Sequence, residues 1–343
     1  MSGIKVEMTP RKLSFGYLYD FRNPAPWRRP WDALYAETLD LIVWSESAGF
    51  AGAWVPEHHL AEDGYQTSPL IALAAIAART KTIRLGSAIA LAPLYDPLRF
   101  AEDCAVLDHL SRGRADMALA IGYRRREYEA FGLDFTKRGA RFDEFLHVVR
   151  ALWAGESVTF EGKHVAVRNA RLAQPPRNGR VPLYIGGFAD KALTRVARYA
   201  DGYIGNEDVC GIYLNKWKAA GKSEADARIR IQGLFFTVAH DPAQAMEELA
   251  PFYHYVNNGY ALWLNEDKAS GVDNVLKPMD LDAFKKSGIL QIATPDQAIE
   301  KFKTMRVRAP VEHFMMMRPP GLPAERFQFY AELFARDVAP AFA

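Results

Sequence analysis

Two adjacent histidines, His58 and His59, are the side chains most suited to acid–base chemistry, and they directly follow a short apolar run. Histidine changes protonation near neutral pH, so at the mouth of a site it can act as acid, base or hydrogen-bond donor. Metal binding and a purely structural hydrogen-bonded pair are the alternatives. A metal needs several converging ligands. The sequence has neither H-x-H nor H-E-x-x-H, and only Glu312-His313 could add a ligand. We therefore expect no metal.

Three glycine-containing segments could bind a flat or phosphorylated ligand. Gly186-Gly187-Phe188-Ala189 precedes a predicted helix, and free N–H groups at a helix N-terminus attract anions. The run from Gly86 to Ala90 has small side chains that let a flat ligand approach the backbone. Gly122-Tyr123 ends another strand, with Glu127 four residues after the tyrosine. A tight turn and an ordinary inward strand are the alternatives for the first two segments.

The elements that position these residues alternate between short β-branched or aromatic runs and longer amphipathic stretches. The predicted strands span residues 13–19, 50–55, 82–90, 114–121, 181–186, 202–205, 229–239 and 311–317. Helical spacing fills most of the intervals, for example at residues 30–48, 69–80 and 141–153. Eight such repeats predict an α/β fold with a parallel sheet closed into a (β/α)8 TIM barrel, whose chemistry lies at the carboxyl ends of the strands.

Two segments depart from the repeat. Residues 158–167 alternate around Glu161-Gly162 and predict a hairpin. Residues 252–290 form a long mixed stretch, which we interpret as an insertion after strand seven that packs over the barrel mouth. We predict one domain over residues 1–343.

Composition and motifs limit the partners and the cellular location that we expect. The net charge of +2 gives no reason to expect nucleic acid or an anionic membrane as partner. The two cysteines form no disulfide framework, and no apolar run reaches the length of a membrane span. No signal peptide precedes the first strand, and no G-x-G-x-x-G or Walker A motif is present. We expect a cytoplasmic protein without a Rossmann-type dinucleotide module.

Taken together, the motifs resemble the bacterial luciferase-like monooxygenase family. The residues that carry the resemblance occur in family order from residue 13 to about 205. They are Trp54-Val-Pro-Glu-His-His59, Ile83-Arg-Leu-Gly-Ser-Ala88, Pro97-Leu-Arg-Phe-Ala-Glu102, Leu107-Asp-His-Leu-Ser-Arg-Gly-Arg114, Gly122-Tyr-Arg, Phe131-Gly132, Pro182-Leu-Tyr-Ile-Gly-Gly187 and Ala200-Asp-Gly202.

The resemblance implies a flavin at the barrel mouth, either reduced FMN or a deazaflavin coenzyme. It assigns His58 as the catalytic residue beside the ring. It places Ser87, Ala88 and Ile89 under the ring, with a cis peptide at Ala88–Ile89. The remaining cofactor-binding positions are Gly122, Tyr123 and a phosphate cradle at Gly186, Gly187, Phe188 and Ala189.

There are departures from luciferase itself, which has a cysteine and an arginine where this chain has Ala120 and Ile121. One basic phosphate ligand is therefore missing, and Arg124, Arg125 or Arg126 could replace it. The expected activity is monooxygenation of a small organic substrate with reduced FMN and dioxygen, the flavin being supplied by a separate reductase. Tyr260 and Trp263 are candidate wall residues of the pocket. The alternatives are deazaflavin-dependent hydride transfer, a non-catalytic flavin-binding protein and a metal-dependent hydrolase. A homodimer is expected because the family is often dimeric.

Overall fold

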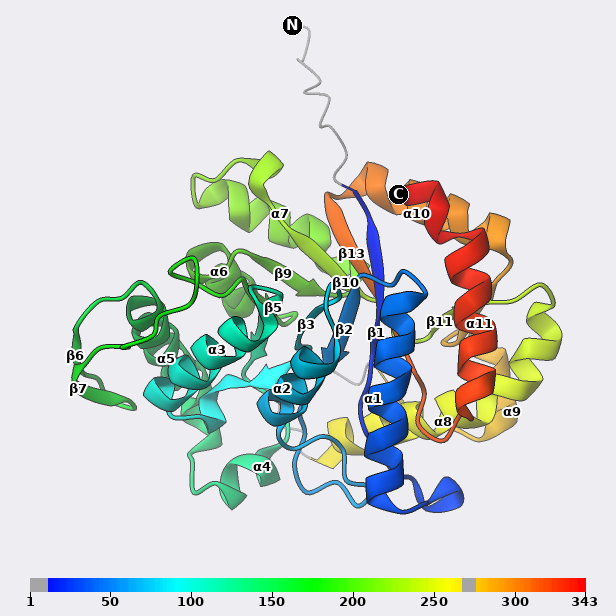
Figure 1. Ribbon diagram of the computed structural model, residues 1–343, viewed down its shortest axis with the longest axis horizontal. Coiled ribbons are helices and arrows are strands. Elements are labelled where there is room, and N and C mark those ends of the chain that lie inside the picture. Colours follow the sequence, from blue (N-terminus) through cyan, green and yellow to red (C-terminus); the bar gives the residue numbers. More distant parts are fainter. Residues whose placement is uncertain (1–11, 267–275) are drawn as a thin grey trace, which may run out of the picture.

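The computed structural model describes residues 12–266 and 276–343 and contains a closed eight-stranded parallel barrel (Figure 1). The barrel strands, in chain order, are β1 (Ser14–Leu18), β2 (Gly52–Val55), β3 (Arg84–Ser87), β5 (Ala115–Ala120), β8 (Leu183–Gly186), β9 (Gly202–Gly205), β10 (Ile229–Gln232) and β13 (Val311–Met317). Each pairs with its neighbour, β1 pairs with β13, and the β3–β5 pairing completes the ring. The predicted (β/α)8 barrel is confirmed.

Helices cover the outside of the barrel and bury one apolar face each. They are α1 (Trp31–Ser47), α2 (Pro69–Arg79), α3 (Pro97–Ser111), α5 (Arg138–Trp153), α6 (Asp190–Tyr199), α7 (Cys210–Ala219), α10 (Pro295–Arg308) and α11 (Ala324–Asp337). Three more helices, α4 (Arg125–Ala130), α8 (Pro242–Glu266) and α9 (Leu281–Lys286), lie in the connections. Single 3-10 turns occupy Ala25–Trp27, Ala92–Leu94, Phe135–Lys137, Glu207–Val209, Glu224–Asp226 and Ala339–Phe342. In the described parts of the chain, no helix combines the length and apolar character needed to span a bilayer.

The predicted strand at residues 82–90 is interrupted. It forms β3 and then the short β4 (Ala90–Leu91), which also pairs with β5. Between them lies a cis peptide bond at Ala88–Ile89, the bond that the resemblance implied.

The predicted strand at residues 229–239 is wrong as a single element. The barrel strand ends at Gln232 and the chain turns at Gly233, where a β-carbon would lie 1.9 Å from the Phe314 ring. The next strand, β11 (Phe236–Val238), pairs with β12 (Gln291–Ala293) in a separate two-stranded sheet. Phe314 packs against Phe236 and Phe302 on the helix-facing side of β13 and leaves no space for a side chain at Gly233.

One of the two predicted excursions, the hairpin, is present in the structure. Strands β6 (Val158–Glu161) and β7 (Ala166–Ala170) form the antiparallel hairpin. The interval 252–290 begins inside α8 and includes α9, while residues 267–275 lie outside the described residues. Helix α8 crosses the end of the barrel at which β1 finishes (Figure 1).

Candidate active site

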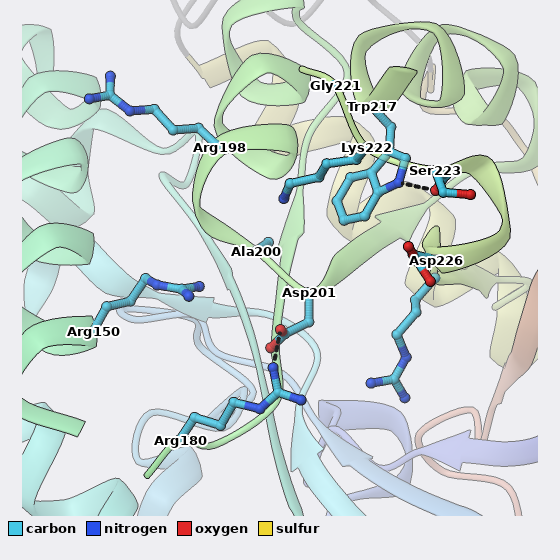
Figure 2. Close-up of a pocket in the computed structure, with 11 residues that line it drawn as sticks. Arg150, Arg180, Arg198, Ala200, Asp201, Trp217, Gly221, Lys222, Ser223 and Asp226 are labelled. Carbon is cyan, nitrogen blue, oxygen red and sulfur yellow. Dashed lines mark hydrogen bonds and ion pairs between the residues drawn. The ribbon is translucent and has the colours of Figure 1, made fainter. Parts of the chain in front are cut away.

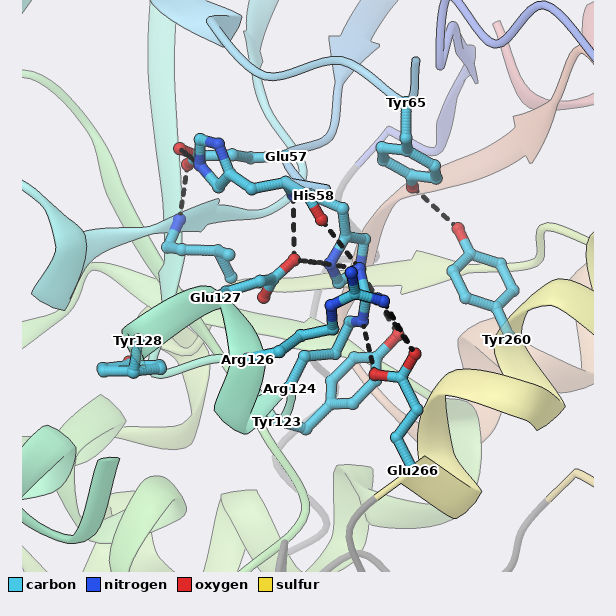
Figure 3. A network of polar contacts seen from close by, with 12 residues as sticks. Glu57, His58, Tyr65, Tyr123, Arg124, Arg126, Glu127, Tyr128, Tyr260 and Glu266 are labelled. Atoms are coloured by element: carbon cyan, nitrogen blue, oxygen red, sulfur yellow. Dashed lines mark hydrogen bonds and ion pairs between the residues drawn. The ribbon is translucent and has the colours of Figure 1, made fainter. Parts of the chain in front are cut away.

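His58 lies just beyond the carboxyl end of β2, where it is 7% exposed. Its ring nitrogen Nδ1 is 3.0 Å from Glu127 Oε1, and Nε2 is 3.3 Å from the Tyr123 hydroxyl (Figure 3). Its backbone N–H donates to the carbonyl oxygen of Gln66, which fixes the loop that carries it. The imidazole is thus held between one carboxylate and one phenol at the mouth of the barrel.

Glu127 is the charged partner of this histidine and belongs to α4, which follows β5. Burial opposes its ionisation, but hydrogen bonds from His58 and the His59 backbone, together with the Arg124 charge, outweigh burial and lower the pKa of Glu127. The carboxylate is therefore ionised at neutral pH. The sequence placed Glu127 near Tyr123 but gave no signal that it would reach His58, 69 residues earlier.

Tyr123 stands at the end of β5, after Gly122, whose φ of 68° is readily available only to glycine. Burial is the main cause that raises the pKa of the Tyr123 hydroxyl well above its ordinary value. The phenol is consequently a neutral hydrogen-bond donor and acceptor beside His58.

The second half of α8 brings aromatic side chains against these groups. The Trp263 ring lies 5.0 Å from the His58 ring, and the Tyr260 hydroxyl is 2.8 Å from that of Tyr65. Tyr65 itself packs 4.9 Å from His58. The rings of Tyr65, Tyr260 and Trp263 therefore surround the imidazole of His58.

Two buried arginines pack against the ring of Trp263. The guanidinium groups of Arg22 and Arg124 lie 5.4 and 4.5 Å from the Trp263 ring centroid, a cation–π arrangement. Arg22 donates to Asp63 at 2.6 Å, and Arg124 is paired with Glu266 at the end of α8 at 3.1 Å. Arg124 is thus committed to α8 and cannot also serve the cradle after β8.

The strand-three segment adjoins the same mouth. Ser87 exchanges hydrogen bonds with the backbone of Ala118, so its hydroxyl joins β3 to β5. Ala88 is buried in the barrel interior, whereas Ile89 keeps partial exposure and packs against that interior. Its Cδ1 would lie 2.4 Å from a β-carbon at Gly186, so the Ile89 side chain would have to shift if Gly186 carried a side chain.

The turn after β8 leads directly into α6. Gly187 has φ 142°, and a β-carbon there would lie 2.7 Å from that of Ala192. Phe188 is 54% exposed, and Ala189 is the N-cap residue of α6. The first intrahelical hydrogen bonds are accepted by Ala189, so the N–H groups that precede them remain outside the helical ladder. The four predicted cradle residues thus connect the last residue of β8 to the first residue of α6.

His59 has a different environment from His58. Its Nε2 lies 3.0 Å from Glu57, which also accepts from the Tyr95 hydroxyl and the Leu91 backbone N–H. This network ties the end of β2 to the segment after β3. Among residues 12–266 and 276–343, no group of three or more histidine, cysteine, aspartate or glutamate side chains is arranged to hold a metal ion.

A hollow of about 640 Å³ opens at the opposite, amino-terminal end of the barrel (Figure 2). Cations dominate its lining, but they stand where helices end: Arg150 near the end of α5, Arg198 near the end of α6, and Lys222 after α7. Cations stabilise helix C-termini, and Arg180 and Arg228 are paired with Asp201 and Glu312. The positive charge is therefore explained by the helix ends and ion pairs, and the catalytic candidates lie at the other end.

Comparisons with known proteins show which family and fold this chain is similar to. Residues 14–313 match the family described as luciferase-like monooxygenase. Limonene 1,2-monooxygenase from Rhodococcus erythropolis is 26% identical over 340 residues, which cover 93% of this chain and 85% of that protein. F420-dependent glucose-6-phosphate dehydrogenase from Mycolicibacterium smegmatis is 27% identical over 328 residues, covering 89% and 93%.

A shorter match, 30% identical over 165 residues, covers 46% of an uncharacterized protein y4vJ from Sinorhizobium fredii. Among solved structures, monooxygenase RslO1 from Streptomyces bottropensis superposes with a TM-score of 0.77 and 24% identity, covering 96% of this chain and all of that one. At that identity the likeness establishes the shared fold.

Proposed function

Since the chain belongs to the luciferase-like monooxygenase family, whose members are oxidoreductases, we propose that it is a monooxygenase that uses reduced FMN and dioxygen on a small organic substrate. One observation carries the proposal. A buried histidine with an anionic and a phenolic partner lies at the same barrel end as a two-glycine turn that opens a helix.

The residues present fit a phosphorylated, planar cofactor. The cradle after β8 is shaped by Gly186 and Gly187, at both of which a side chain would clash with a neighbour. The N-terminus of α6 suits a phosphate, because the backbone N–H groups and the helix dipole both favour an anion. Ile89 adjoins this cradle, and His58 and Tyr123 line the mouth beside it. Ser87 and Ala88 would act through the backbone and shape of the strand-three segment.

Each group at the mouth has a distinct task in this proposal. Reduced FMN, when bound, would supply the electrons that activate dioxygen. His58 would exchange a proton with the reacting centre through Nε2, the nitrogen that faces Tyr123. Trp263, Tyr260 and Tyr65 would exclude water, since they pack around His58 and α8 fixes two of them.

Deazaflavin-dependent hydride transfer is the second candidate, because a relative similar over most of both chains is a deazaflavin-coenzyme enzyme by name. Its cofactor would occupy the same cradle, and the two candidates differ in their need for dioxygen. A separate reductase would supply reduced flavin in the first case.

The assembly proposed for the enzyme is supported by its surface. Apolar side chains Ile71 on α2 and Val106 and Leu110 on α3 are 74%, 49% and 52% exposed. Exposed apolar residues on neighbouring helices are typical of an interface. We therefore propose a homodimer through α2 and α3, and we keep the cytoplasmic location as a separate proposal.

An absorbance and fluorescence titration tests the cofactor. We expect the purified protein to bind FMN or a deazaflavin coenzyme, and Gly187→Ala to weaken that binding about tenfold because φ 142° is strained for alanine. Gly155→Ala is the matched control, because Gly155 also has a positive φ (81°) but follows α5, outside the cradle. Oxygen consumption with reduced FMN supports monooxygenation, whereas anaerobic turnover with the deazaflavin alone supports hydride transfer. Absence of binding by both cofactors contradicts the proposal.

A further inference from the structure

Glu127 concentrates three hydrogen bonds on one oxygen atom at the catalytic histidine. Its Oε1 lies 3.0 Å from His58 Nδ1, 2.9 Å from the His59 backbone nitrogen and 3.4 Å from Arg124 Nη1. The side chain is fully buried, and the second oxygen, Oε2, is buried without a hydrogen-bond partner. A carboxylate in this position costs desolvation free energy, so its placement calls for an explanation.

The charge on Glu127 decides where the proton of His58 resides. An ionised carboxylate can only accept hydrogen bonds, so Nδ1 of His58 must carry a proton to be its partner. In neutral His58, the lone pair is then on Nε2. That nitrogen faces the Tyr123 hydroxyl at 3.3 Å, longer than the bond to Glu127.

We propose that Glu127 is a positioning residue that holds His58 in the tautomer protonated on Nδ1, so that Nε2 and the Tyr123 hydroxyl form the proton-transferring pair of the site. When Nε2 takes a proton, one N–H bond forms there and one bond to hydrogen breaks in the donor. The resulting imidazolium is stabilised by Glu127, and the proton returns by the same nitrogen. The reaction served rests on the proposed function, whereas the tautomer is a property of the protein alone.

A purely structural role for Glu127 is the competing explanation, because the carboxylate also receives the His59 N–H. Arg124 connects this carboxylate to α8, since it contacts Glu127, the His59 carbonyl oxygen and Glu266. A structural brace would tolerate any acceptor of the same shape. A tautomer-setting group requires a side chain that cannot donate, and glutamine can donate through its amide.

Nitrogen-15 NMR of the histidine ring tests this difference in wild type, Glu127→Gln and Glu127→Asp. Glu129→Gln, on the exposed side of the same helix, is the matched control. His58→Asn identifies the signals by their loss. We expect one tautomer with Nδ1–H in wild type, the control and the aspartate variant, and a mixture of tautomers in Glu127→Gln.

Kinetics provide the second readout. Glu127→Gln is expected to slow the reoxidation of reduced FMN by dioxygen about tenfold, while its FMN affinity stays within about twofold of wild type. A proton on Nε2 in the wild type, or an unchanged tautomer in Glu127→Gln, overturns the proposal. If the tautomer shifts but no cofactor supports turnover, Glu127 still positions His58 and the proposed function fails.

Discussion

Two buried histidines lie at opposite ends of the same barrel, and their surroundings differ in kind. His58 is 7% exposed at the carboxyl end of β2, and His313 is 4% exposed at the beginning of β13. Both rings contact aromatic neighbours, Trp263 in the first case and Trp54 in the second. Burial and aromatic packing therefore do not distinguish a reactive histidine from a structural one.

The hydrogen-bond partners do distinguish them. At His313, Trp54 Nε1 donates to Nε2 at 2.8 Å and Ser14 Oγ lies 2.8 Å from Nδ1. Burial, followed by the charge of Arg230, lowers the pKa of His313 to about 3, so this ring stays neutral. His58 instead has an anionic partner on one side and a longer contact to Tyr123 on the other. A neutral, doubly satisfied ring is part of the core, whereas a ring with one anchored and one exchangeable partner can transfer protons.

The largest effect expected from this comparison is on turnover. His58→Ala should bind flavin with little change but react about 10²- to 10⁴-fold more slowly, because the proton-transferring group is lost. Stopped-flow reoxidation of reduced FMN measures the rate. His59→Ala is the control, since His59 is tied to Glu57. Equal turnover by wild type and His58→Ala would show that His58, like His313, has only a structural role.

The next effect concerns stability at the other end. Arg230 is 3% exposed, donates to Asp116 and lies over the rings of Trp54 and Tyr184. Arg230→Met leaves the buried Asp116 with fewer partners and should lower the free energy of unfolding by about 3 kcal/mol. Chemical denaturation measures this loss.

The control for that variant is an exposed ion pair. Arg168→Met removes a partner of Glu161 in a pair that is mostly solvated, so it should leave the denaturation midpoint nearly unchanged. Equal losses of stability in Arg230→Met and Arg168→Met would show that burial of the Arg230–Asp116 pair makes no difference to its contribution.

The smallest effect is a pH dependence of stability. Because the folded-state pKa of His313 is lowered to about 3, the unfolded chain binds a proton there below about pH 6.5 while the native state does not. This residue's contribution to stability is therefore complete above pH 6.5 and is lost on acidification, by about 2 kcal/mol at pH 5. Denaturation of wild type and His313→Gln at pH 7.5 and 5 should show the wild type losing more. Equal losses of stability in wild type and His313→Gln would show that a group other than His313 causes the pH dependence.

Sequence reasoning recovered the barrel because each strand and helix is encoded locally. Eight runs of apolar residues, separated by helical spacing, suffice to predict the ring. The strand at residues 229–239 was mispredicted because its second part, β11, pairs with β12, which lies far along the chain. Helix α10 was missed although Thr294 and Gln297 form a capping box at its start.

The candidate site was recovered only in part for the same reason. His58 and the glycine turn stand out as local motifs. The pairings of His58 with Glu127 and of Arg124 with Glu266 join residues 69 and 142 positions apart, and no local spacing encodes such contacts.

The position of α8 has a stereochemical consequence. Residues after β1 and β13, such as Asp20, Arg22 and Arg318, are buried, with Tyr253 and Tyr255 of α8 bonded to Met317 and Asp63 there. Ile89 after β3 and Phe188 after β8 keep more exposure. A planar ring bound between these halves would offer a reactant only one of its faces, so we expect a prochiral compound to yield a single enantiomer.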